Sequence, residues 1–339
     1  MVRKKEKYNL AVIGVGTVGI EMLKVLHQRK FPIDKLVVLA RSKRDITVEG
    51  KLYHVGKISS ELFNGIDIAL FAGTEGEKGA AVTFGKVAAS KGVVVIDNGN
   101  DFRMDPDVPL VIPEVNPEDI KSHKNIIANP NCSTIQMVIA LAPIHKLAKI
   151  RRIIVSTYQS VSGTGRAAIG ELKKQVQDYA DGKGITGFEA YPYQIAFNVI
   201  PHIGSFGKLG YTTEEWKMVK ETHKILHDDT IEITATTVRV PVFYAHSESI
   251  YIETEREVSI KEITSVLKDA QGISVVEDIS ADPPQYPMPI FAEGKDDTYV
   301  GRIRKDPFKK NGINMWVVSD NIRKGAALNA VQIAEELIR

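Results

Sequence analysis

Short apolar runs alternate with amphipathic segments along the first third of the chain. A short apolar run followed by a helical repeat is typical of a buried strand and its crossover helix. The expected strands are Tyr8–Ile13, Leu36–Ala40, Ile66–Ala72 and Val93–Ile96, and the expected helices are Val18–Gln28 and Ala80–Ser90. This alternation predicts a doubly wound, mostly parallel sheet.

The pattern changes near Pro130. A long apolar helix is expected at Ser133–Leu147, interrupted by Pro143. The later expected elements are strands at Ile153–Tyr158, Ile231–Val242, Ile250–Thr254 and Met315–Ser319, helices at Ala167–Ala180, Thr213–Leu226 and Lys324–Ile338, and an extended proline-rich loop at 281–289. We therefore predict an α/β chain with two domains. A Rossmann-type doubly wound parallel sheet covers 1–131 and is completed by the C-terminal helix 322–339, and an α+β domain covers 132–321.

Composition excludes several classes of protein. The chain has 339 residues, 43% of them hydrophobic, so it can build a large core and is not globally disordered. The net charge of +2 gives no reason to expect a nucleic-acid partner. A single cysteine rules out an intramolecular disulfide scaffold and favours the cytoplasm. No apolar run is long enough to span a membrane, and three glycines break the N-terminal run that superficially resembles a signal peptide.

The first expected strand runs into the sequence GVGTVG. Gly14, Gly16 and Gly19 form a GxGxxG motif between a strand and a helix, with Thr17 and Val18 inside it. The first glycine permits a tight turn, the second lets a pyrophosphate approach the backbone, and the third lets the helix pack on the strand. The free N–H groups at the start of the helix would bind the phosphates. The motif predicts a dinucleotide site.

The second expected strand indicates which dinucleotide binds. An NAD site usually has an acidic residue at the end of this strand to bind the ribose 2′-hydroxyl. Here the strand runs into Arg41-Ser42-Lys43-Arg44. Positive charge and a hydroxyl suit a 2′-phosphate, so we expect NADP(H), with contacts from Arg41 and Ser42. We assign no metal site.

The single cysteine, Cys132, lies where the long apolar helix begins. A helix N-terminus lowers the pKa of a thiol and so favours the reactive thiolate. Lone cysteines are also commonly buried and inert. Position alone leaves both interpretations open.

Several motifs together resemble the aspartate-semialdehyde dehydrogenase family. They are RMDPDVPLVIPEVN, NPNCSTIQM around the cysteine, QSVSGTG from Gln159, the run from Arg239 to His246, and SDNIRKGAALNAVQIAEEL at the C-terminus. The resemblance covers nearly the whole chain. It implies a fold similar to glyceraldehyde-3-phosphate dehydrogenase, with a second domain for catalysis and dimerisation, and a homodimer or homotetramer.

The resemblance also implies a reaction. Such an enzyme interconverts L-β-aspartyl phosphate with L-aspartate 4-semialdehyde and inorganic phosphate, using NADP(H). Cys132 would form a thioester, because covalent catalysis divides one difficult step into easier ones. In cells the reductive direction would supply the biosynthesis of diaminopimelate and lysine, and of threonine, methionine and isoleucine.

Two further residues take catalytic and binding roles by resemblance. His246 would carry a proton near the thiohemiacetal oxygen. Arg239 would hold the substrate carboxylate with its guanidinium fork. Seven residues separate the two, which places them on opposite faces of a regular strand. Both can face one site only if the chain bulges or bends near Phe243–Ala245.

The remaining substrate contacts are also implied by resemblance. Glu214 would meet the substrate amino group, while Lys217 and Arg103 would bind phosphate. Because Glu214 and Lys217 lie three residues apart on an expected helix, they could equally form an ordinary surface pair. Gln159 would orient the substrate beside the thiolate, and Asn131 would touch substrate or phosphate.

Further cofactor contacts are expected from Thr74, Asn98, Ser162, Gly163 and Asn321. Lys324 has two possible interpretations, a cofactor contact or a surface lysine. The chain departs from the family pattern at Gly73-Thr74-Glu75-Gly76-Glu77-Lys78, where two acids replace the usual small residues. It departs again at Gly99-Asn100, where serines are more common.

Three alternatives share much of this pattern. N-acetyl-γ-glutamyl-phosphate reductase would use the same fold and chemistry, but the sequence around Cys132 and the Gln159–Gly165 run argue against it. Malonyl-CoA reductase would need room for coenzyme A at the phosphate site. A regulatory paralogue without activity would be expected to lose Cys132, Gln159, Arg239 or His246, all of which are present.

Overall fold

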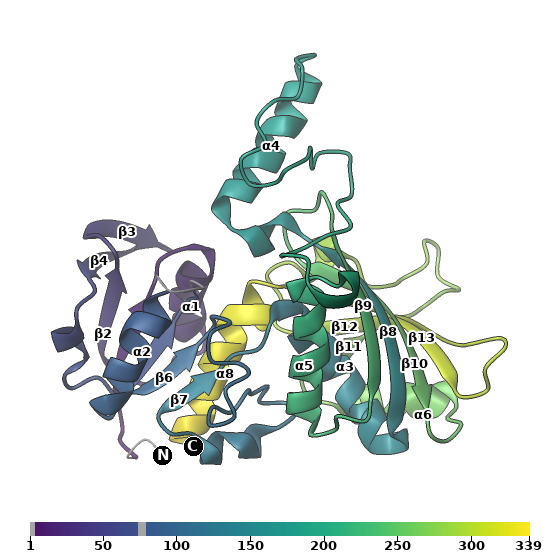
Figure 1. Cartoon of the computed structure of the whole chain (residues 1–339), viewed down its shortest axis with the longest axis horizontal. Coiled ribbons are helices and arrows are strands. Elements are labelled where there is room, and N and C mark those ends of the chain that lie inside the picture. The colour runs from purple at the N-terminus through teal and green to yellow at the C-terminus, as the bar shows by residue number, and fades with distance from the viewer. Residues whose placement is uncertain (1–3, 74–78) are drawn as a thin grey trace. The chain divides into compact units, whose positions relative to one another are not determined.

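The computed structural model describes residues 4–73 and 79–339 (Figure 1). The chain divides into two compact units. One contains Met1–Asn131 and Gly325–Arg339, and the other contains Cys132–Lys324. Among the described residues, no helix is both long and apolar enough to cross a bilayer.

The first unit is built on a sheet with strand order β3-β4-β2-β1-β5-β6-β7 among the described residues. All neighbouring strands are parallel except the antiparallel pair β3 and β4. The strands are β1 (Tyr8–Ile13), β2 (Ile33–Ala40), β3 (Arg44–Val48), β4 (Lys51–Lys57), β5 (Ile68–Phe71), β6 (Val94–Asp97) and β7 (Ile126–Ala128). The order reverses at β1, where β2 lies on one side and β5 on the other. Ligands of doubly wound sheets bind at such a switch point, outside the carboxyl ends of the strands.

Three helices pack on this sheet: α1 (Thr17–Gln28), α2 (Ala80–Ser90) and α8 (Leu328–Ile338). The sequence 322–339 was expected to complete this unit, and α8 supplies a large part of its apolar core, packing against β5, β6 and α1. A π-helical turn, Arg323–Ala327, precedes α8, so the final helix is not one regular α-helix from Lys324 as predicted.

The second unit contains a mixed sheet with strand order β11-β12-β13-β10-β8-β9 among the described residues. Its strands are β8 (Ile150–Gln159), β9 (Glu232–Arg239), β10 (His246–Thr254), β11 (Ile273–Val275), β12 (Thr298–Lys305) and β13 (Gly312–Ser319). The central strand β10 is antiparallel to both of its neighbours, β8 and β13. These two sheets confirm the predicted fold class.

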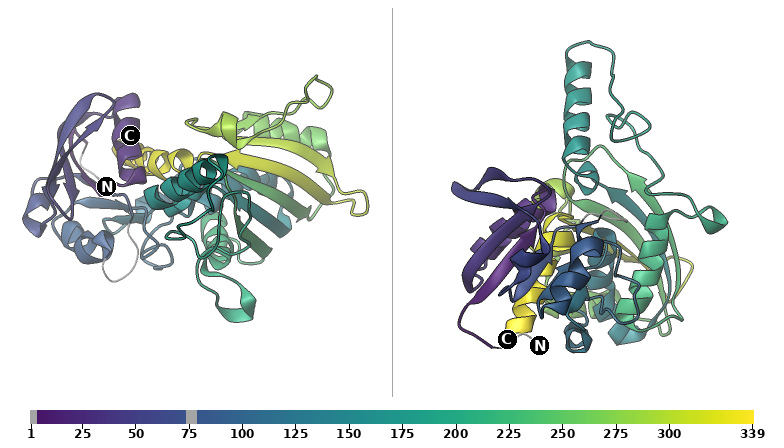
Figure 2. Two further views of the ribbon diagram at one scale, coloured as in Figure 1. Left: turned by 90° about the horizontal axis from the view of Figure 1, so that it is seen from above. Right: turned by 60° about the vertical axis from the view of Figure 1, so that its left-hand side comes forward.

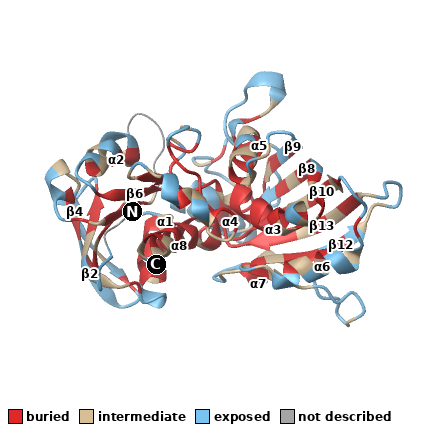
Figure 3. Ribbon diagram, turned by 90° about the horizontal axis from the view of Figure 1, so that it is seen from below, coloured by how far each residue is buried: buried red, intermediate tan, exposed pale blue. Residues whose placement is uncertain are grey.

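One helix forms the core of the second unit. Helix α3 (Cys132–Ala148) packs on β8, β10, β12 and β13 and is buried along almost its whole length (Figure 3). A helix that is apolar all round is expected in such a place. Pro143 lies inside α3 without ending it, so the predicted interruption is wrong.

The other helices of the second unit are α4 (Arg166–Ala180), α5 (Thr213–Leu226), α6 (Ile260–Asp269) and the short α7 (Pro289–Ala292). Helix α4 stands out from the rest of its unit (Figures 1 and 2). Helices α5 and α6 each begin with a capping box. The side chains of Thr212 and Ser259 accept from the backbone N–H of the glutamate three residues on, and the side chain of that glutamate accepts from the backbone N–H of the capping residue.

Several strands were not predicted, and β3 and β4 show why. Their residues are mostly polar and exposed, so they lack the apolar run that predicts a buried strand. The turn between β3 and β4 is the sequence feature that could have predicted this hairpin. Glu49 and Gly50 have φ of 47° and 78°, the pair of positive values that a two-residue hairpin turn requires.

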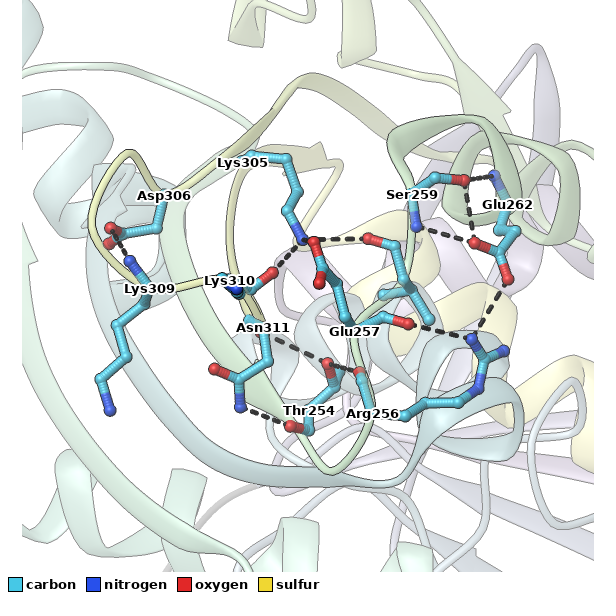
Figure 4. Close-up of polar contacts among 11 residues, drawn as sticks. Thr254, Arg256, Glu257, Ser259, Glu262, Lys305, Asp306, Lys309, Lys310 and Asn311 are labelled. Atoms are coloured by element: carbon cyan, nitrogen blue, oxygen red, sulfur yellow. Dashed lines mark hydrogen bonds and ion pairs between the residues drawn. The ribbon is translucent and has the colours of Figure 1, made fainter.

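A largely exposed polar network lies at the C-terminal end of β10 (Figure 4). We call it the distal network; it comprises Thr254, Arg256, Glu257, Ser259, Glu262, Lys305, Asp306, Lys309, Lys310 and Asn311. Arg256 donates to Glu262 at 3.2 Å, and Asn311 Nδ2 donates to the Thr254 carbonyl at 2.6 Å. These bonds join the end of β10 to α6 and to the turn between β12 and β13.

Candidate active site

The single cysteine meets a histidine that is distant in sequence. Cys132 is the first residue of α3, and its Sγ lies 3.3 Å from Nε2 of His246, the first residue of β10. The thiol is partly exposed, whereas the histidine is fully buried. This contact joins a nucleophile to an imidazole at the start of a helix, where free backbone N–H groups favour a thiolate.

Ser160 determines which nitrogen of His246 carries the proton. The Ser160 backbone N–H donates to Nδ1 at 3.0 Å, and the Ser160 hydroxyl also lies 3.0 Å from that nitrogen. A backbone N–H can only donate, so Nδ1 accepts, and the neutral ring carries its proton on Nε2. Burial and the Arg239 charge hold the pKa of His246 well below its usual range. The ring therefore stays neutral near pH 7 and presents Nε2–H to the sulfur.

The turn that carries Ser160 is fixed from behind by an amide. Oδ1 of Asn321 accepts from the Ala245 backbone at 3.0 Å and from the hydroxyls of Ser160 and Ser162 at 3.1 Å. Asn321 and Ser162 were predicted to contact the cofactor. In this structure their polar atoms hold the turn against His246, and the cofactor contacts remain predictions.

Arg239 and His246 face the same turn. Nη1 of Arg239 donates to the Ser160 carbonyl at 2.6 Å. A Cβ atom on Gly163 would lie 3.1 Å from that Nη1 and 3.3 Å from Cε1 of His246, so any other residue would crowd both side chains. The single strand predicted to reach Val242 ends instead at Arg239, and Ala245 has a φ of 66°. The predicted bend is thus present, as a connection between β9 and β10.

A buried chain of polar groups links α3 to α5 beside the cysteine. Nε2 of Gln159 donates to the Ser133 hydroxyl and, at 3.1 Å, to Oε1 of Glu214. The other Glu214 oxygen lies 3.4 Å from Nζ of Lys217. The Glu214 and Lys217 side chains are 9% and 18% exposed, so this is not an ordinary surface pair. Within the described part of the chain, Oε1 of Gln159 is buried without a hydrogen-bond partner, which leaves it available to a ligand.

The second unit therefore brings together Cys132, Gln159, Glu214, Lys217, Arg239 and His246. Arg103 and Asn131 belong to the first unit, where both are buried. Nη2 of Arg103 donates to the Asn98 carbonyl at 2.9 Å. The Asn98 side chain donates to the Phe71 carbonyl at 3.0 Å and accepts from Asn129 at 2.9 Å, which ties the end of β5 to the segment after β7.

The glycine-rich turn has the features that a dinucleotide requires. Gly14 has a φ of 97°, and a Cβ on Gly19 would lie 1.9 Å from the Gly14 carbonyl oxygen, so both positions need glycine. Gly16 faces open space, which allows a ligand to approach its backbone. Among the residues that the structure describes, helix α1 has no side-chain cap, and Oγ1 of Thr17 is buried without a partner. These unsatisfied groups fit a pyrophosphate.

The end of β2 carries the predicted selectivity residues. Arg41 and Ser42 are exposed directly after Ala40, and Arg44 donates to the Ser42 hydroxyl at 3.1 Å. Thr74 and the Glu75-Gly76-Glu77 sequence lie outside the described residues. In the described part of the chain, no group of three His, Cys, Asp or Glu residues could hold a metal ion.

Two residues beside the site were not predicted from the sequence. Ser160 lies within the QSVSGTG motif, which predicted no role for it. Glu248 lies two residues after His246 and therefore on the same face of β10. It is fully buried, and neither carboxylate oxygen is in hydrogen-bonding geometry with a partner in residues 4–73 and 79–339. Burial raises the pKa of Glu248 well above its usual range, and the Gln136 side chain offsets this only in part. The sequence signal that could have identified Glu248 is an acidic residue at a strand position that faces the interior.

Two family models match the chain. The model described as the semialdehyde dehydrogenase NAD binding domain matches residues 9–123. The model described as the semialdehyde dehydrogenase dimerisation domain matches residues 141–324.

Curated proteins and solved structures agree with these models. The chain is 54% identical to an aspartate-semialdehyde dehydrogenase of Aquifex aeolicus, and the match covers 98% of each protein. It is 47% identical to an aspartate-semialdehyde dehydrogenase of Bacillus subtilis, and that match covers 97% of each protein. It is also similar to the crystal structure of aspartate semialdehyde dehydrogenase II complexed with ASA from Vibrio cholerae. That structure has a TM-score of 0.93 at 45% identity, covering 99% of each chain.

Proposed function

This chain belongs to the aspartate-semialdehyde dehydrogenase family, and we propose that it interconverts L-β-aspartyl phosphate with L-aspartate 4-semialdehyde and phosphate, using NADP(H) and a thioester on Cys132. The observation that carries the proposed mechanism is the 3.3 Å contact between Sγ of Cys132 and Nε2 of His246 at the start of α3. A dehydrogenase that forms a thioester needs a thiolate beside a proton-bearing group.

In the reductive direction the first step makes the thioester. The Cys132 thiolate attacks the acyl carbon of β-aspartyl phosphate, a carbon–sulfur bond forms, and the carbon–oxygen bond to phosphate breaks as phosphate leaves. The Nε2–H of His246 donates to the sulfur before attack and so stabilises the thiolate. The N–H groups of the first turn of α3 stabilise the same charge.

The second step reduces the thioester to the aldehyde. When bound, the reduced nicotinamide supplies the hydride. The carbonyl oxygen gains negative charge as the carbon becomes tetrahedral, and Nε2–H of His246 is the nearby donor that stabilises this charge. The carbon–sulfur bond then breaks, which releases the aldehyde and regenerates the thiolate. Because Ser160 holds Nδ1 as an acceptor, the donor stays on Nε2 throughout.

The substrate is held by charged groups around the thiolate. Arg239 takes the α-carboxylate, since a guanidinium fork matches a carboxylate. Glu214 takes the amino group, and Gln159 directs its buried, unpartnered Oε1 toward the substrate. Lys217, Arg103 and Asn131 bind the phosphate group.

The cofactor binds at the glycine-rich turn. Gly16 and Thr17 face the pyrophosphate, and Arg41 and Ser42 bind the 2′-phosphate that distinguishes NADP from NAD. The Arg41→Ala variant should weaken NADP binding about tenfold or more and leave NAD binding nearly unchanged, because the charge-assisted hydrogen bonds from the guanidinium to the 2′-phosphate are lost. Equal weakening of both would place Arg41 away from the 2′-phosphate.

The cellular setting follows from the same proposal. The product would feed the biosynthesis of diaminopimelate and lysine, and of threonine, methionine and isoleucine, in the cytoplasm. The match of residues 141–324 to a dimerisation domain supports assembly into a homodimer or homotetramer through the second unit.

The decisive experiment follows NADPH formation by absorbance, with aspartate semialdehyde and NADP supplied with and without phosphate. Turnover that depends on phosphate is expected. Turnover without phosphate would contradict the phosphorylating reaction. If aspartate semialdehyde is not oxidised although NADP binds, the substrate assignment fails, and N-acetyl-γ-glutamyl phosphate and malonyl-CoA become the substrates to assay.

A further inference from the structure

The segment between α4 and α5 folds back onto Arg239. We call residues 187–200 the return segment. Its Tyr191 is buried, and the centre of the Tyr191 ring lies 5.9 Å from Cζ of Arg239. An aromatic face at this distance attracts a guanidinium through the ring's negative charge distribution.

Two side chains of α4 fix the return segment on both sides of Tyr191. A carboxylate oxygen of Glu171 accepts from the backbone of Glu189 at 2.8 Å and of Ala190 at 2.6 Å. Oε1 of Gln175, which is fully buried, accepts from the backbone of Ile195 and Ala196 at 3.1 and 3.0 Å. These bonds satisfy backbone donors of a segment that has no helix or strand to satisfy them.

The end of the return segment pairs with the backbone of Arg239. Ile200 donates to the Arg239 carbonyl at 2.9 Å, and Arg239 donates back at 2.8 Å, which forms an antiparallel bridge. The Tyr191 hydroxyl donates to Oγ1 of Thr164 at 2.9 Å, in the turn that contains Gly163. An apolar cluster closes the arrangement; it comprises Val161, Ala168, Leu172, Tyr191, Ile195, Ala196 and Ile200.

The contacts of Arg239 leave hydrogen-bond donors for a ligand. In its side chain, Nη1 donates to the Ser160 carbonyl, and Nε is buried without a partner among the described residues. The ring of Tyr191 restrains the guanidinium without using any of its N–H groups. A restrained fork binds a carboxylate at a smaller cost in side-chain entropy.

We propose that Tyr191 is a positioning residue that restrains the Arg239 guanidinium for the substrate carboxylate, so that the return segment determines how strongly this carboxylate binds. The inference rests on the proposed function, in which Arg239 takes the carboxylate. Tyr191 acts through its ring, and its hydroxyl serves to attach it to Thr164.

The experiment compares three variants of the full-length enzyme in the oxidative assay. Tyr191→Leu should raise the KM for aspartate semialdehyde about tenfold with kcat within about twofold of the parent, because a desolvated cation–π contact is lost. Tyr191→Phe keeps the ring and should restore KM to within about threefold of the parent. Tyr193→Leu is the matched control, since Tyr193 lies two residues away and is 65% exposed; its KM should not change.

A substrate without the carboxylate separates positioning from a general structural role. For 3-aminopropanal, kcat/KM should be the same in Tyr191→Leu and the parent, so the preference for aspartate semialdehyde should fall. Equal losses on both aldehydes would overturn the proposal. If Tyr191→Leu does not fold, as judged by thermal unfolding, Tyr191→Met is the second variant. It also lacks the ring, its flexible side chain can fill an irregular space, and it should show the same change in preference.

Arg239→Leu distinguishes failure of this inference from failure of the proposed function. If Arg239→Leu raises KM and Tyr191→Leu does not, the inference is wrong and the carboxylate assignment stands. If Arg239→Leu leaves KM unchanged, the carboxylate assignment fails and the inference fails with it. In the double variant, Tyr191→Leu should add no further rise in KM; an additive rise would show that Tyr191 does not act through Arg239.

Discussion

Strand β10 has a different polar environment at each of its two ends. At its start, His246 is fully buried among Cys132, Ser160 and Arg239. Polar atoms of Gln159, Arg239 and Glu248 are buried there without hydrogen-bond partners among the described residues. At its end, the distal network is largely exposed, and its backbone and side-chain groups bond to one another (Figure 4). Buried polar atoms without partners therefore lie at the start of β10, whereas the polar groups at its end bond to one another.

The difference indicates where each kind of polar group belongs. An exposed ion pair gains little, because water screens it and ordering the side chains costs entropy. A buried polar atom without a partner lowers stability, so it persists where a ligand can satisfy it. The start of β10 is therefore expected to control activity, and the end to affect stability slightly.

The largest effect is expected when the nucleophile is removed. Cys132→Ser should lower kcat by at least about 10³-fold, about 4 kcal/mol, because a hydroxyl at this position is rarely ionised and cannot replace the thiolate. NADP binding, measured by titration, should stay as in the parent. A variant that keeps the parent rate would contradict the thioester mechanism.

Loss of the guanidinium should have the next largest effect. Arg239→Leu should raise the KM for aspartate semialdehyde about 100-fold, about 2.7 kcal/mol, since a buried carboxylate would lose its charge partner. Arg239→Lys keeps the charge without the fork and should fall between the parent and Arg239→Leu. Steady-state kinetics at saturating NADP and phosphate measures both.

Local patterns in the sequence predicted much of the fold. Strand β1 and helices α2 and α5 have the predicted bounds, because unbroken apolar runs and a helical repeat require no distant partner to be recognised. The bend before His246 was also predictable, since strand geometry places residues seven apart on opposite faces. The matches to known relatives confirm the family resemblance.

The parts of the site that were missed depend on distant contacts. Tyr191 lies in a segment without periodicity. Hydrogen bonds from the backbone of this segment to Glu171 and Gln175, and its bridge to Arg239, hold the segment in place. Ser160 shows its role only once β8 and β10 lie side by side. No local rule links either residue to the residue it contacts.

Substitution of Glu248 tests whether a buried carboxyl group at the start of β10 makes the stability of the protein depend on pH. Its pKa is raised in the folded protein, so above the ordinary carboxyl pKa the unfolded chain releases a proton that the folded chain retains. The carboxyl therefore lowers stability increasingly as the pH rises from about 4.5 toward its folded pKa. Glu248→Gln should raise Tm relative to the parent at pH 8 and much less at pH 5.

Thermal unfolding at several pH values measures this difference. Glu253→Gln is the matched control, because Glu253 lies on the opposite face of the same strand and is paired with Lys309 at 3.4 Å. The control should not show the same rise in relative Tm with pH. If Glu248→Gln changes Tm equally at all pH values, the buried carboxyl does not titrate as described.

The smallest effects are expected in the distal network. Arg256 and Glu262 are 49% and 45% exposed in their ion pair, so Arg256→Ala should lower Tm by only about 1–2 °C and leave kcat and KM unchanged. Ser259→Ala should cost somewhat more, about 1 kcal/mol, because it removes the side chain that caps the backbone of α6. Thermal unfolding of the two variants, with the oxidative assay alongside, tests this order. A loss of activity in Arg256→Ala without a loss of stability would show that the end of β10 also serves the reaction, and the contrast between the two ends would fail.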